Sequence, residues 1–367
     1  MAIKLLVVSS YEGSLTSVRP EAEMVKGLKH HGVEVDVMTK RDTYYAQKFE
    51  ESGMAVFHYV PAKKISLQEI KYIRKILKKG NYDIVHVFNN RAVTNTIFAS
   101  AGLPVKVITY RGFTGHVHWY KPTSYISHLN PKVSKITCVS NGVRNQVRDQ
   151  LFLNKNKAVT IYKGHEPNWY IDVKPVSRAS LEIPDSAFVV GCVANVRRMK
   201  GINYLLEATQ FLKKHADIHL LLVGKGMDNP RFRELIKNSP LAENIHILGF
   251  REDVLNCMKT CNVNVLPSIK GEGLSKVTIE SMSVGVPVIA TDVGGNSELV
   301  ISGRTGKLIP PRSPEKIANE IIELKRNPDW AKELGNNARK HIEQNFNIKR
   351  TIDEMLNLYQ EITNNQA

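Results

Sequence analysis

The chain alternates short apolar runs with amphipathic segments along most of its length. In the first part, apolar runs at 3–10 and 33–39 flank a stretch with helical periodicity at 20–32. Further apolar runs occupy residues 82–88, 105–110, 135–140 and 158–164. Runs of this length, separated by helical patterns, are typical of strands buried in a parallel sheet. The first part is therefore predicted to form a doubly wound α/β sheet.

The same rhythm begins again after residues 165–186, a segment rich in Pro, Ser and charged residues. The second series has apolar runs at 187–195, 218–226, 244–250, 263–268 and 286–292, with helical patterns at 202–215, 230–238 and 253–261. A chain of 367 residues is long enough to bury two cores. We predict two Rossmann-like domains, 1–168 and 169–347. We also expect a C-terminal segment, 348–367, whose amphipathic helix packs back on the first domain.

The charge is unevenly distributed between these two predicted domains. Residues 1–168 carry 25 Lys and Arg against 12 Asp and Glu, while the remainder carries 26 against 23. The excess predicts an anionic partner for the first domain, such as a phospholipid surface or a phosphorylated glycan. Nucleic acid is not expected as a partner, because no recognisable nucleic-acid-binding motif is present.

Cysteine usage and the first residues indicate the compartment. The four cysteines are scattered, and Cys257 and Cys261 alone do not make a metal motif, so buried, idle thiols in a reducing compartment are expected. The N-terminal apolar run is too short for a signal peptide, and no stretch approaches the ~20 apolar residues of a membrane span. We therefore predict a cytoplasmic protein.

The stretch 271–280, GEGLSKVTIE, directly follows a predicted strand and carries two glutamates, Glu272 and Glu280. Ligands of open parallel sheets bind where strands end and helices begin, because helix N-termini present unpaired N–H groups and a positive dipole. Ser275 is suited to cap the helix that follows. A diphosphate is therefore expected at this loop, with the contacts made by Gly273, Leu274, Ser275 and Lys276.

The two glutamates allow two interpretations. Paired carboxylates serve general acid/base chemistry, or they bind the hydroxyls of a sugar and a ribose. Glu272 lies in the loop and Glu280 lies more than a turn into the helix, so action on one atom is not expected. We assign Glu272 to a sugar and Glu280 to a ribose. A surface glutamate remains the alternative for Glu280. A glycoside hydrolase is disfavoured, since its carboxyls must flank one bond about 5–9 Å apart.

Residues 268–310 resemble the signature of the retaining, GT-B-fold glycosyltransferases of family 4. The matching features are Glu272 and Glu280 spaced as E-x7-E, GVPV at 285–288, Gly294-Gly295, ELV at 298–300 and G-x-x-G at 303–306. Segments 194–208, 220–226 and 248–268 are similar to the family as well. The resemblance implies a GT-B fold, a nucleoside-diphosphate sugar as donor, and neither a metal nor another cofactor.

The resemblance also implies roles for the basic segment before Gly201. Lys200 corresponds to the family lysine, and the family arginine is assigned to Arg197, with Arg198 as its competitor. Fixed cations there would stabilise the charge that grows on the leaving diphosphate. Arg197, Lys200 and Glu272 are therefore the three residues expected to be catalytic. The nucleotide base is expected against the loops that hold Gly224 and Arg251, where Phe250 is either a stacking face or core.

In the first domain, the resemblance places Gly13 and Ser14 under the donor phosphate. Arg111 stands where many relatives have a histidine. Arg111 itself is therefore expected to contact the donor sugar or the acceptor, or His116 or His118 does so in its place. Surface-loop histidines are an equal alternative for both.

Residues 63–80 form an amphipathic pattern with an S-x-x-E capping box at Ser66 and Glu69. Seven Lys and Arg residues surround its apolar face, namely Lys63, Lys64, Lys71, Arg74, Lys75, Lys78 and Lys79. Two interpretations remain open. One is a helix packed on the sheet with a solvated basic face, and the other is a peripheral contact with anionic lipid.

The resemblance thus predicts a retaining glycosyltransferase. It would move a sugar from a nucleoside-diphosphate sugar, most readily a UDP-sugar, to a glycan or lipid-linked glycan in cell-surface polysaccharide or lipopolysaccharide synthesis. A nucleotide-sugar epimerase on the same fold and a non-catalytic nucleotide-sugar sensor are the alternatives. A dinucleotide dehydrogenase is disfavoured, because no G-x-G-x-x-G follows either first strand.

Overall fold

The computed structural model describes residues 2–364. The chain forms two compact units. The first holds the described residues up to His165 together with those from Phe346 onward, and the second is Glu166–Asn345. The sequence predicts these domain boundaries after residue 168 and after residue 347.

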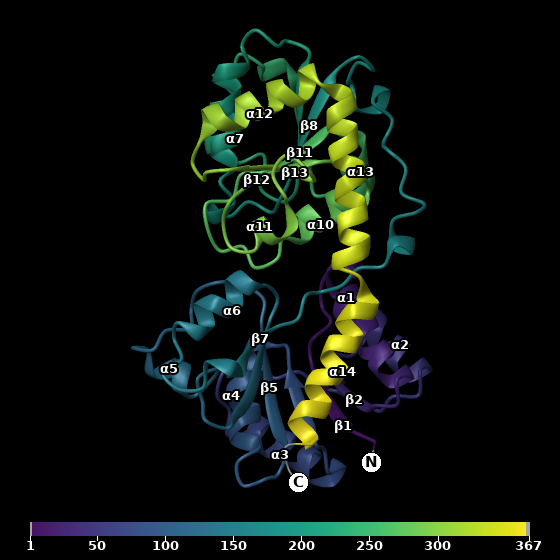
Figure 1. The fold of residues 1–367 in the computed structure, drawn as a ribbon, viewed down its shortest axis with the longest axis vertical. Coiled ribbons are helices and arrows are strands. Elements are labelled where there is room, and N and C mark those ends of the chain that lie inside the picture. Colours follow the sequence, from purple (N-terminus) through teal and green to yellow (C-terminus); the bar gives the residue numbers. More distant parts are fainter. Residues whose placement is uncertain (1, 365–367) are drawn as a thin grey trace. The chain divides into compact units, whose positions relative to one another are not determined.

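Among the described residues, the first unit builds a seven-stranded parallel sheet of order β3-β2-β1-β4-β5-β6-β7 (Figure 1). Its strands are β1 (Lys4–Val8), β2 (Glu34–Thr39), β3 (Val56–His58), β4 (Ile84–Val87), β5 (Lys106–Arg111), β6 (Val133–Cys138) and β7 (Ala158–Thr160). Its helices are α1 (Leu15–His30), α2 (Tyr44–Glu51), α3 (Leu67–Gly80), α4 (Asn90–Ala99), α5 (Pro122–Tyr125), α6 (Asn141–Arg148) and α14 (Ile348–Asn364). β1 pairs with both β2 and β4, so the strand order reverses between β1 and β4.

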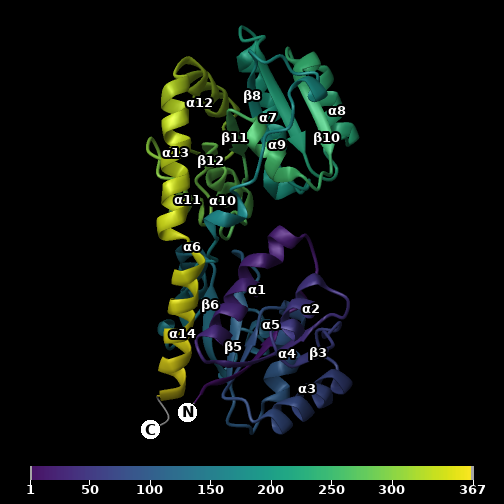
Figure 2. The ribbon, with the colours of Figure 1, turned by 90° about the vertical axis from the view of Figure 1, so that its right-hand side faces the viewer.

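The C-terminal helix α14 is part of the first unit's core and lies beside α1 (Figure 2). Gly27 of α1 leaves room for Ile352 of α14, since a Cβ at Gly27 would overlap that side chain. His86 on β4 is fully buried, with Nδ1 2.8 Å from Tyr359 Oη and Nε2 3.0 Å from Thr137 Oγ1. These contacts fasten α14 to the sheet. Burial lowers the pKa of His86 to about 3.

In the described part of the second unit, six parallel strands follow the order β10-β9-β8-β11-β12-β13. They are β8 (Phe188–Val193), β9 (Ile218–Val223), β10 (Ile245–Gly249), β11 (Val263–Leu266), β12 (Val288–Thr291) and β13 (Gly306–Ile309). The helices are α7 (Ile202–Ala208), α8 (Pro230–Lys237), α9 (Val254–Thr260), α10 (Lys276–Ser283), α11 (Asn296–Leu299), α12 (Pro314–Arg326) and α13 (Pro328–Asn345). The order reverses between β8 and β11.

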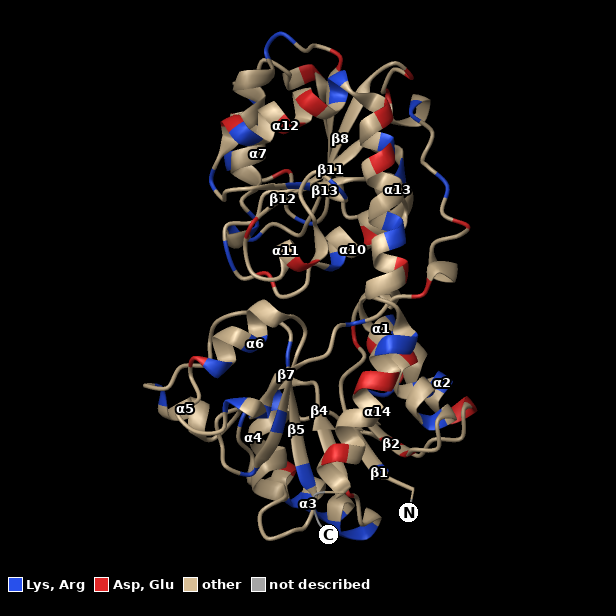
Figure 3. Cartoon of the chain, viewed as in Figure 1, with Lys and Arg blue, Asp and Glu red and all other residues tan. Residues whose placement is uncertain are grey.

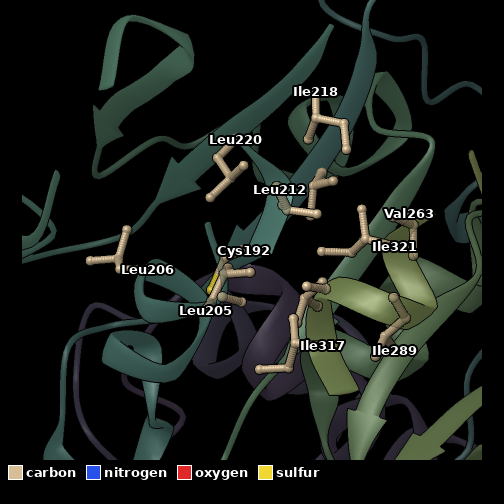
Figure 4. Packing of buried hydrophobic residues seen from close by; sticks show 14 of the residues in the cluster. Cys192, Leu205, Leu206, Leu212, Ile218, Leu220, Val263, Ile289, Ile317 and Ile321 are labelled. Carbon is tan, nitrogen blue, oxygen red and sulfur yellow. The ribbon is translucent and has the colours of Figure 1, made fainter. Parts of the chain in front are cut away.

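The core of the second unit lies between this sheet and the helices α7 and α12 (Figure 4). Leu205 of α7 and Ile317 and Ile321 of α12 pack against strand residues such as Leu220. All six residues of β9 are buried. Helices on both faces of a parallel sheet bury both sides of each strand, which explains the continuous apolar runs in the sequence.

The elements differ from the prediction in several places, and β3 and β13 are not among the predicted strands. Helix α1 begins at Leu15 and passes through Pro20, although a proline normally marks a helix start; the helix continues without one backbone hydrogen bond. The helix predicted at 202–215 is α7 followed by a 3-10 turn at Thr209–Leu212. Within residues 2–364, no helix combines the length and apolar character needed to cross a membrane.

Candidate active site

The loops that follow β8 and β11 meet where the strand order of the second sheet reverses. Ligands of doubly wound sheets bind at such a point, outside the carboxyl ends of the strands. Gly201 in the first loop has φ +62°, and a Cβ there would overlap the carbonyl oxygen of Pro267 in the second. The Ile269 amide donates to the Met199 carbonyl at 2.8 Å. The backbone therefore holds the two loops together.

The side chains of Lys200 and Glu272 are joined by this arrangement. Lys200 Nζ lies 2.6 Å from Glu272 Oε1, and Ser268 Oγ donates to the same oxygen at 2.5 Å. Glu272 is only 6% exposed, so water screens the Lys200–Glu272 pair weakly. Two of the three residues predicted to be catalytic are thus in direct contact.

The third, Arg197, lies in the same loop and is exposed, as is Arg198. In the part of the chain that the structure describes, neither guanidinium forms a hydrogen bond or an ion pair with another residue. Arg197 directly precedes a 3-10 turn at Arg198–Lys200. Both arginines are available to an anionic ligand, and the choice between them stays a prediction.

Helix α10 begins at the carboxyl end of β11, as the sequence predicts for GEGLSKVTIE. Ser275 is its N-cap, and the Ser275 hydroxyl accepts from the Thr278 amide at 3.3 Å. The preceding Gly273 is buried and Leu274 half-buried. The positive end of the helix dipole lies here, together with the backbone amides of the first turn. This terminus meets the requirement for a diphosphate site.

Glu280 lies in the interior of α10 and is buried. Its Oε1 is 3.4 Å from Nζ of Lys276, one turn earlier on the same helix. The alternative of a surface glutamate is wrong for this residue, since its carboxylate is enclosed. The ribose contact assigned to it stays a prediction.

The glycine pair after β12 packs against the Glu272 backbone. Gly294 has φ +61°, and a Cβ there would overlap the carbonyl oxygen of Glu272. The Thr291 hydroxyl donates to the Ser268 carbonyl at 2.5 Å. The loop after β12 thus packs against the backbone that carries Glu272. This close packing explains why the motif has a glycine at position 294.

The loops after β9 and β10 continue the site along the sheet edge. Gly224 has φ +137°, and a Cβ there would overlap the carbonyl oxygen of Ala194. The Asn195 side chain accepts from the Lys225 amide at 3.1 Å, and the Val196 amide donates to the Lys225 carbonyl at 2.9 Å. Asn195 and Val196 therefore join the loops after β8 and β9.

Phe250 presents its ring at this edge and is 59% exposed, so the alternative that it belongs to the core is wrong. Lys225 Nζ lies 4.8 Å from the ring centroid. The neighbouring Arg251 forms a bidentate pair with Asp253, at 2.7 and 2.6 Å, which lowers the pKa of the Asp253 carboxyl. Phe250 therefore offers the flat face expected for a nucleotide base better than Arg251 does.

In the first unit, Gly13 and Ser14 lie between β1 and α1, next to the reversal point of that sheet. Gly13 has φ +126°, and Ser14 is the N-cap of α1 without a side-chain capping bond. Gly13 also lines a pocket of about 660 Å³, whose walls include Arg41 and Tyr44. Small-molecule sites are typically about 300–1,000 Å³ in volume.

Arg111 is placed differently from the expectation that it contacts a sugar or acceptor. Its guanidinium is buried and donates to the carbonyls of Phe113 at 3.3 Å and Gly115 at 2.6 Å. Burial lowers the pKa of Arg111. Arg111 therefore fixes its own loop. In the same loop His116 is exposed, with φ +65°, and His118 stacks on a tyrosine ring at 5.1 Å.

Sequence reasoning missed the supporting roles of Ser268, Thr291 and Asn195. All three lie within the segments that resemble the family, but they are small polar residues at strand ends and none is one of the matched motif positions. The described residues hold no group of three or more His, Cys, Asp or Glu side chains placed to bind a metal ion. Cys257 and Cys261 are buried in a hydrophobic core, as expected.

Two family models match the chain side by side. The model of the glycosyl transferases group 1 matches residues 173–341, and the model of glycosyltransferase family 4 matches residues 22–169. An uncharacterized glycosyltransferase of Methanocaldococcus jannaschii is 26% identical over 98% of this chain and 99% of its own length. The Escherichia coli UDP-Gal:alpha-D-GlcNAc-diphosphoundecaprenol alpha-1,3-galactosyltransferase is 25% identical over 90% of both chains.

The fold also has solved counterparts. HepE of Anabaena, whose crystal structure is a complex with UDP and glucose, superposes with a TM-score of 0.78 over 98% of this chain and all of its own, at 20% identity. The two parallel-sheet units thus define a GT-B protein. With both of its halves matched by family models, the chain belongs to the glycosyltransferases of family 4 and is a transferase.

Proposed function

We propose that this enzyme transfers a sugar, with retention, from a UDP-sugar to a glycan or lipid-linked glycan acceptor in the synthesis of cell-surface polysaccharide or lipopolysaccharide. The observation that carries the proposal is the Lys200–Glu272 pair at the β8/β11 reversal point. It lies between the exposed arginines of one loop and the α10 N-terminus of the other.

The donor diphosphate is assigned to Lys200, Arg197 and the first amides of α10. Breaking the bond to the sugar leaves negative charge on the phosphate oxygens, and groups fixed in advance stabilise that charge most. These cations supply the stabilisation without a metal or other cofactor. In a front-face transfer with retention, the leaving phosphate itself takes the acceptor proton. Glu272 and Glu280 then bind hydroxyls and do not exchange protons.

The two glutamates are assigned to different parts of the donor. Both side-chain bonds of Glu272 are made by Oε1, so we assign Oε2 to a hydroxyl of the transferred sugar. Glu280 is assigned to the ribose, and Phe250 to the base. UDP is favoured because the Anabaena neighbour was crystallised with UDP and the Escherichia coli relative is named for UDP-Gal.

The acceptor is assigned to the first unit. The name of the Escherichia coli relative includes a diphosphoundecaprenol acceptor, and the positive charge of the first 168 residues suits such an anionic, lipid-linked molecule. Gly13 with its pocket and the exposed His116 are the candidate contacts. The basic helix α3 is a candidate contact with the membrane that carries such an acceptor, and its exposed Leu67 supports this.

The test is Lys200→Met, with Lys316→Met on the exposed face of α12 as the matched control. With a labelled UDP-sugar, we expect kcat to fall about 10²–10³-fold in the first variant, as for removal of one preorganised charge stabiliser, and to be unchanged in the second. Label transferred to an acceptor supports a glycosyltransferase. Label that stays on the nucleotide identifies an epimerase, and a thermal shift without turnover identifies a sensor. Full activity of Lys200→Met refutes the site.

A further inference from the structure

A cluster of large apolar side chains is exposed on the first unit, in and beside the loop that also carries His116 and His118, where His118 stacks on the Tyr120 ring at 5.1 Å. Its members, which we call the aromatic tip, are Trp119, Tyr120, Phe152 and Leu153, with exposed fractions of 52%, 60%, 71% and 84%. Trp119 and Tyr120 lie in the loop between β5 and α5, and Phe152 and Leu153 follow α6. Contiguous exposed apolar groups of this size mark an interaction surface.

The aromatic tip is held in place by specific contacts. The Trp119 ring lies 5.7 Å from the Phe152 ring, edge to face, and 5.8 Å from the Tyr120 ring. The Trp119 amide donates to Gln150 Oε1 at 3.2 Å, and the Gly115 amide donates to Gln146 Oε1 at 2.6 Å. Two backbone amides of the first loop are thus bonded to Gln146 on α6 and to Gln150 just after it.

The part of the chain that carries the aromatic tip has an almost entirely positive charge. Residues 84–165 carry eleven Lys and Arg but a single acidic residue, Asp149. Lys121 Nζ lies 5.9 Å from the Tyr120 ring, and Lys155 follows Leu153 by two positions and is exposed. Figure 3 shows the basic residues of β5 and α6 in this part of the first unit.

We propose that the aromatic tip inserts into the interfacial layer of an anionic membrane. Trp and Tyr favour this layer because their rings are apolar while their N–H and O–H groups stay hydrated, and nearby lysines bind anionic headgroups. A sugar-stacking platform would need polar side chains beside the ring, whereas the rings next to that of Trp119 are those of Phe152 and Tyr120. A protein partner would have to be strongly acidic to match residues 84–165.

The aromatic tip differs from the surface of α3 that the sequence suggests for lipid. α3 offers lysines with Ile65 and Leu67 beside them, whereas the tip offers aromatic rings with few charges of its own. The proposal does not depend on the transferase reaction, because membrane binding is measured without a donor or acceptor. A failure of one proposal therefore leaves the other standing.

The experiment uses the full chain and vesicles of phosphatidylglycerol with phosphatidylcholine, compared with phosphatidylcholine alone. In co-sedimentation, we expect Phe152→Ser/Leu153→Ser to bind anionic vesicles at least tenfold more weakly than the parent. Lys121→Glu should weaken binding about fivefold or more, since one basic residue near such a surface contributes ~1 kcal/mol. A chain with Trp119 as its sole tryptophan, made by Trp169→Phe/Trp330→Phe, should be quenched by brominated lipids.

Phe211→Ser is the matched control, because Phe211 is 51% exposed on the second unit; it should bind like the parent. Lys78→Glu/Lys79→Glu tests α3 separately. Unchanged binding of Phe152→Ser/Leu153→Ser, or a Trp119 that brominated lipids do not quench, overturns the proposal. So does light scattering that shows dimers of the parent and monomers of the tip variant without vesicle binding, because a second copy would then be the occupant. Circular dichroism checks that each variant is folded.

Discussion

Gly294, in the glycine pair of the family motif, packs against Glu272 and so helps to position the Lys200–Glu272 pair. Adding a single methyl group at Gly294 tests this role. Gly294→Ala places a Cβ where the carbonyl oxygen of Glu272 lies. Gly303 is the matched control, since its φ of +77° is also positive but a Cβ there meets nothing within 4 Å. Both substitutions strain the backbone, and only the first displaces the site.

The expected magnitudes follow from this difference. Alanine in a left-handed conformation costs about 1–2 kcal/mol, which is the whole cost at Gly303. At Gly294 the overlap adds about 1–3 kcal/mol, as for other overpacked sites. Relief requires a shift of about 1 Å in the backbone of Glu272, whose carboxylate fixes Lys200 at 2.6 Å. A misplacement of about 1 Å can lower the rate about 10²-fold.

The assay combines urea unfolding with initial rates of donor turnover. We expect Gly303→Ala to lose about 1–2 kcal/mol of unfolding free energy with kcat within about twofold of the parent. Gly294→Ala should lose more stability and about 10²-fold in kcat. If kcat falls equally in both variants, or in neither, the loop after β12 does not position Glu272 and the reasoning is refuted.

Two further outcomes are expected. His86 is buried between Tyr359 and Thr137 with a pKa of about 3, against about 6.5 in the unfolded chain, so the unfolded state binds the extra proton. The contribution of neutral His86 to the free energy of unfolding is complete above pH 6.5 and is lost as the pH falls toward 3, by up to about 5 kcal/mol. In urea titrations between pH 7 and 5, His86→Gln should therefore reduce the dependence of the unfolding free energy on pH. An unchanged dependence would assign it to other groups. Phe250→Ala should raise the donor KM by about tenfold with kcat little changed, because base stacking contributes about 1–3 kcal/mol; steady-state kinetics check this, and a larger effect of Arg251→Ala would reverse the assignment.

Most strands were predictable because the sheets are parallel and covered on both faces. A central strand is then a continuous apolar run, as in β9, where every residue is buried. The strands β3 and β13 were not predicted, because they are short, lie at the sheet edges and are only partly buried. Several helices were not predicted, and for two of them the reason is clear. α6 buries only Val143 and Val147, too few for a clear period. The long α13 packs largely through small residues, with Gly335 against the Gly285 carbonyl oxygen, so its apolar stripe is weak.

The site was predictable in part. The motif indicated Glu272, and the segment before Gly201 indicated Lys200, but their contact depends on β8 being the neighbour of β11. Which strands are neighbours depends on the strand order of the sheet, and a local sequence pattern does not predict that order. Arg111 shows the opposite case. An arginine at a strand end suggests a ligand contact, but here its guanidinium donates to the carbonyls of its own loop.

The contacts around Lys200 show how this fold supplies a fixed positive charge. A lysine side chain has many rotamers, and holding one costs up to ~2 kcal/mol of entropy. Here Glu272 holds the ammonium group before any ligand binds, and Gly201 and Gly294 allow three loops to approach closely enough to hold Glu272. The Lys200 side chain is thus ordered when the protein folds, before a ligand binds. A diphosphate that reaches this edge meets a cation already in position, which is the condition under which electrostatic stabilisation of a leaving group is most effective.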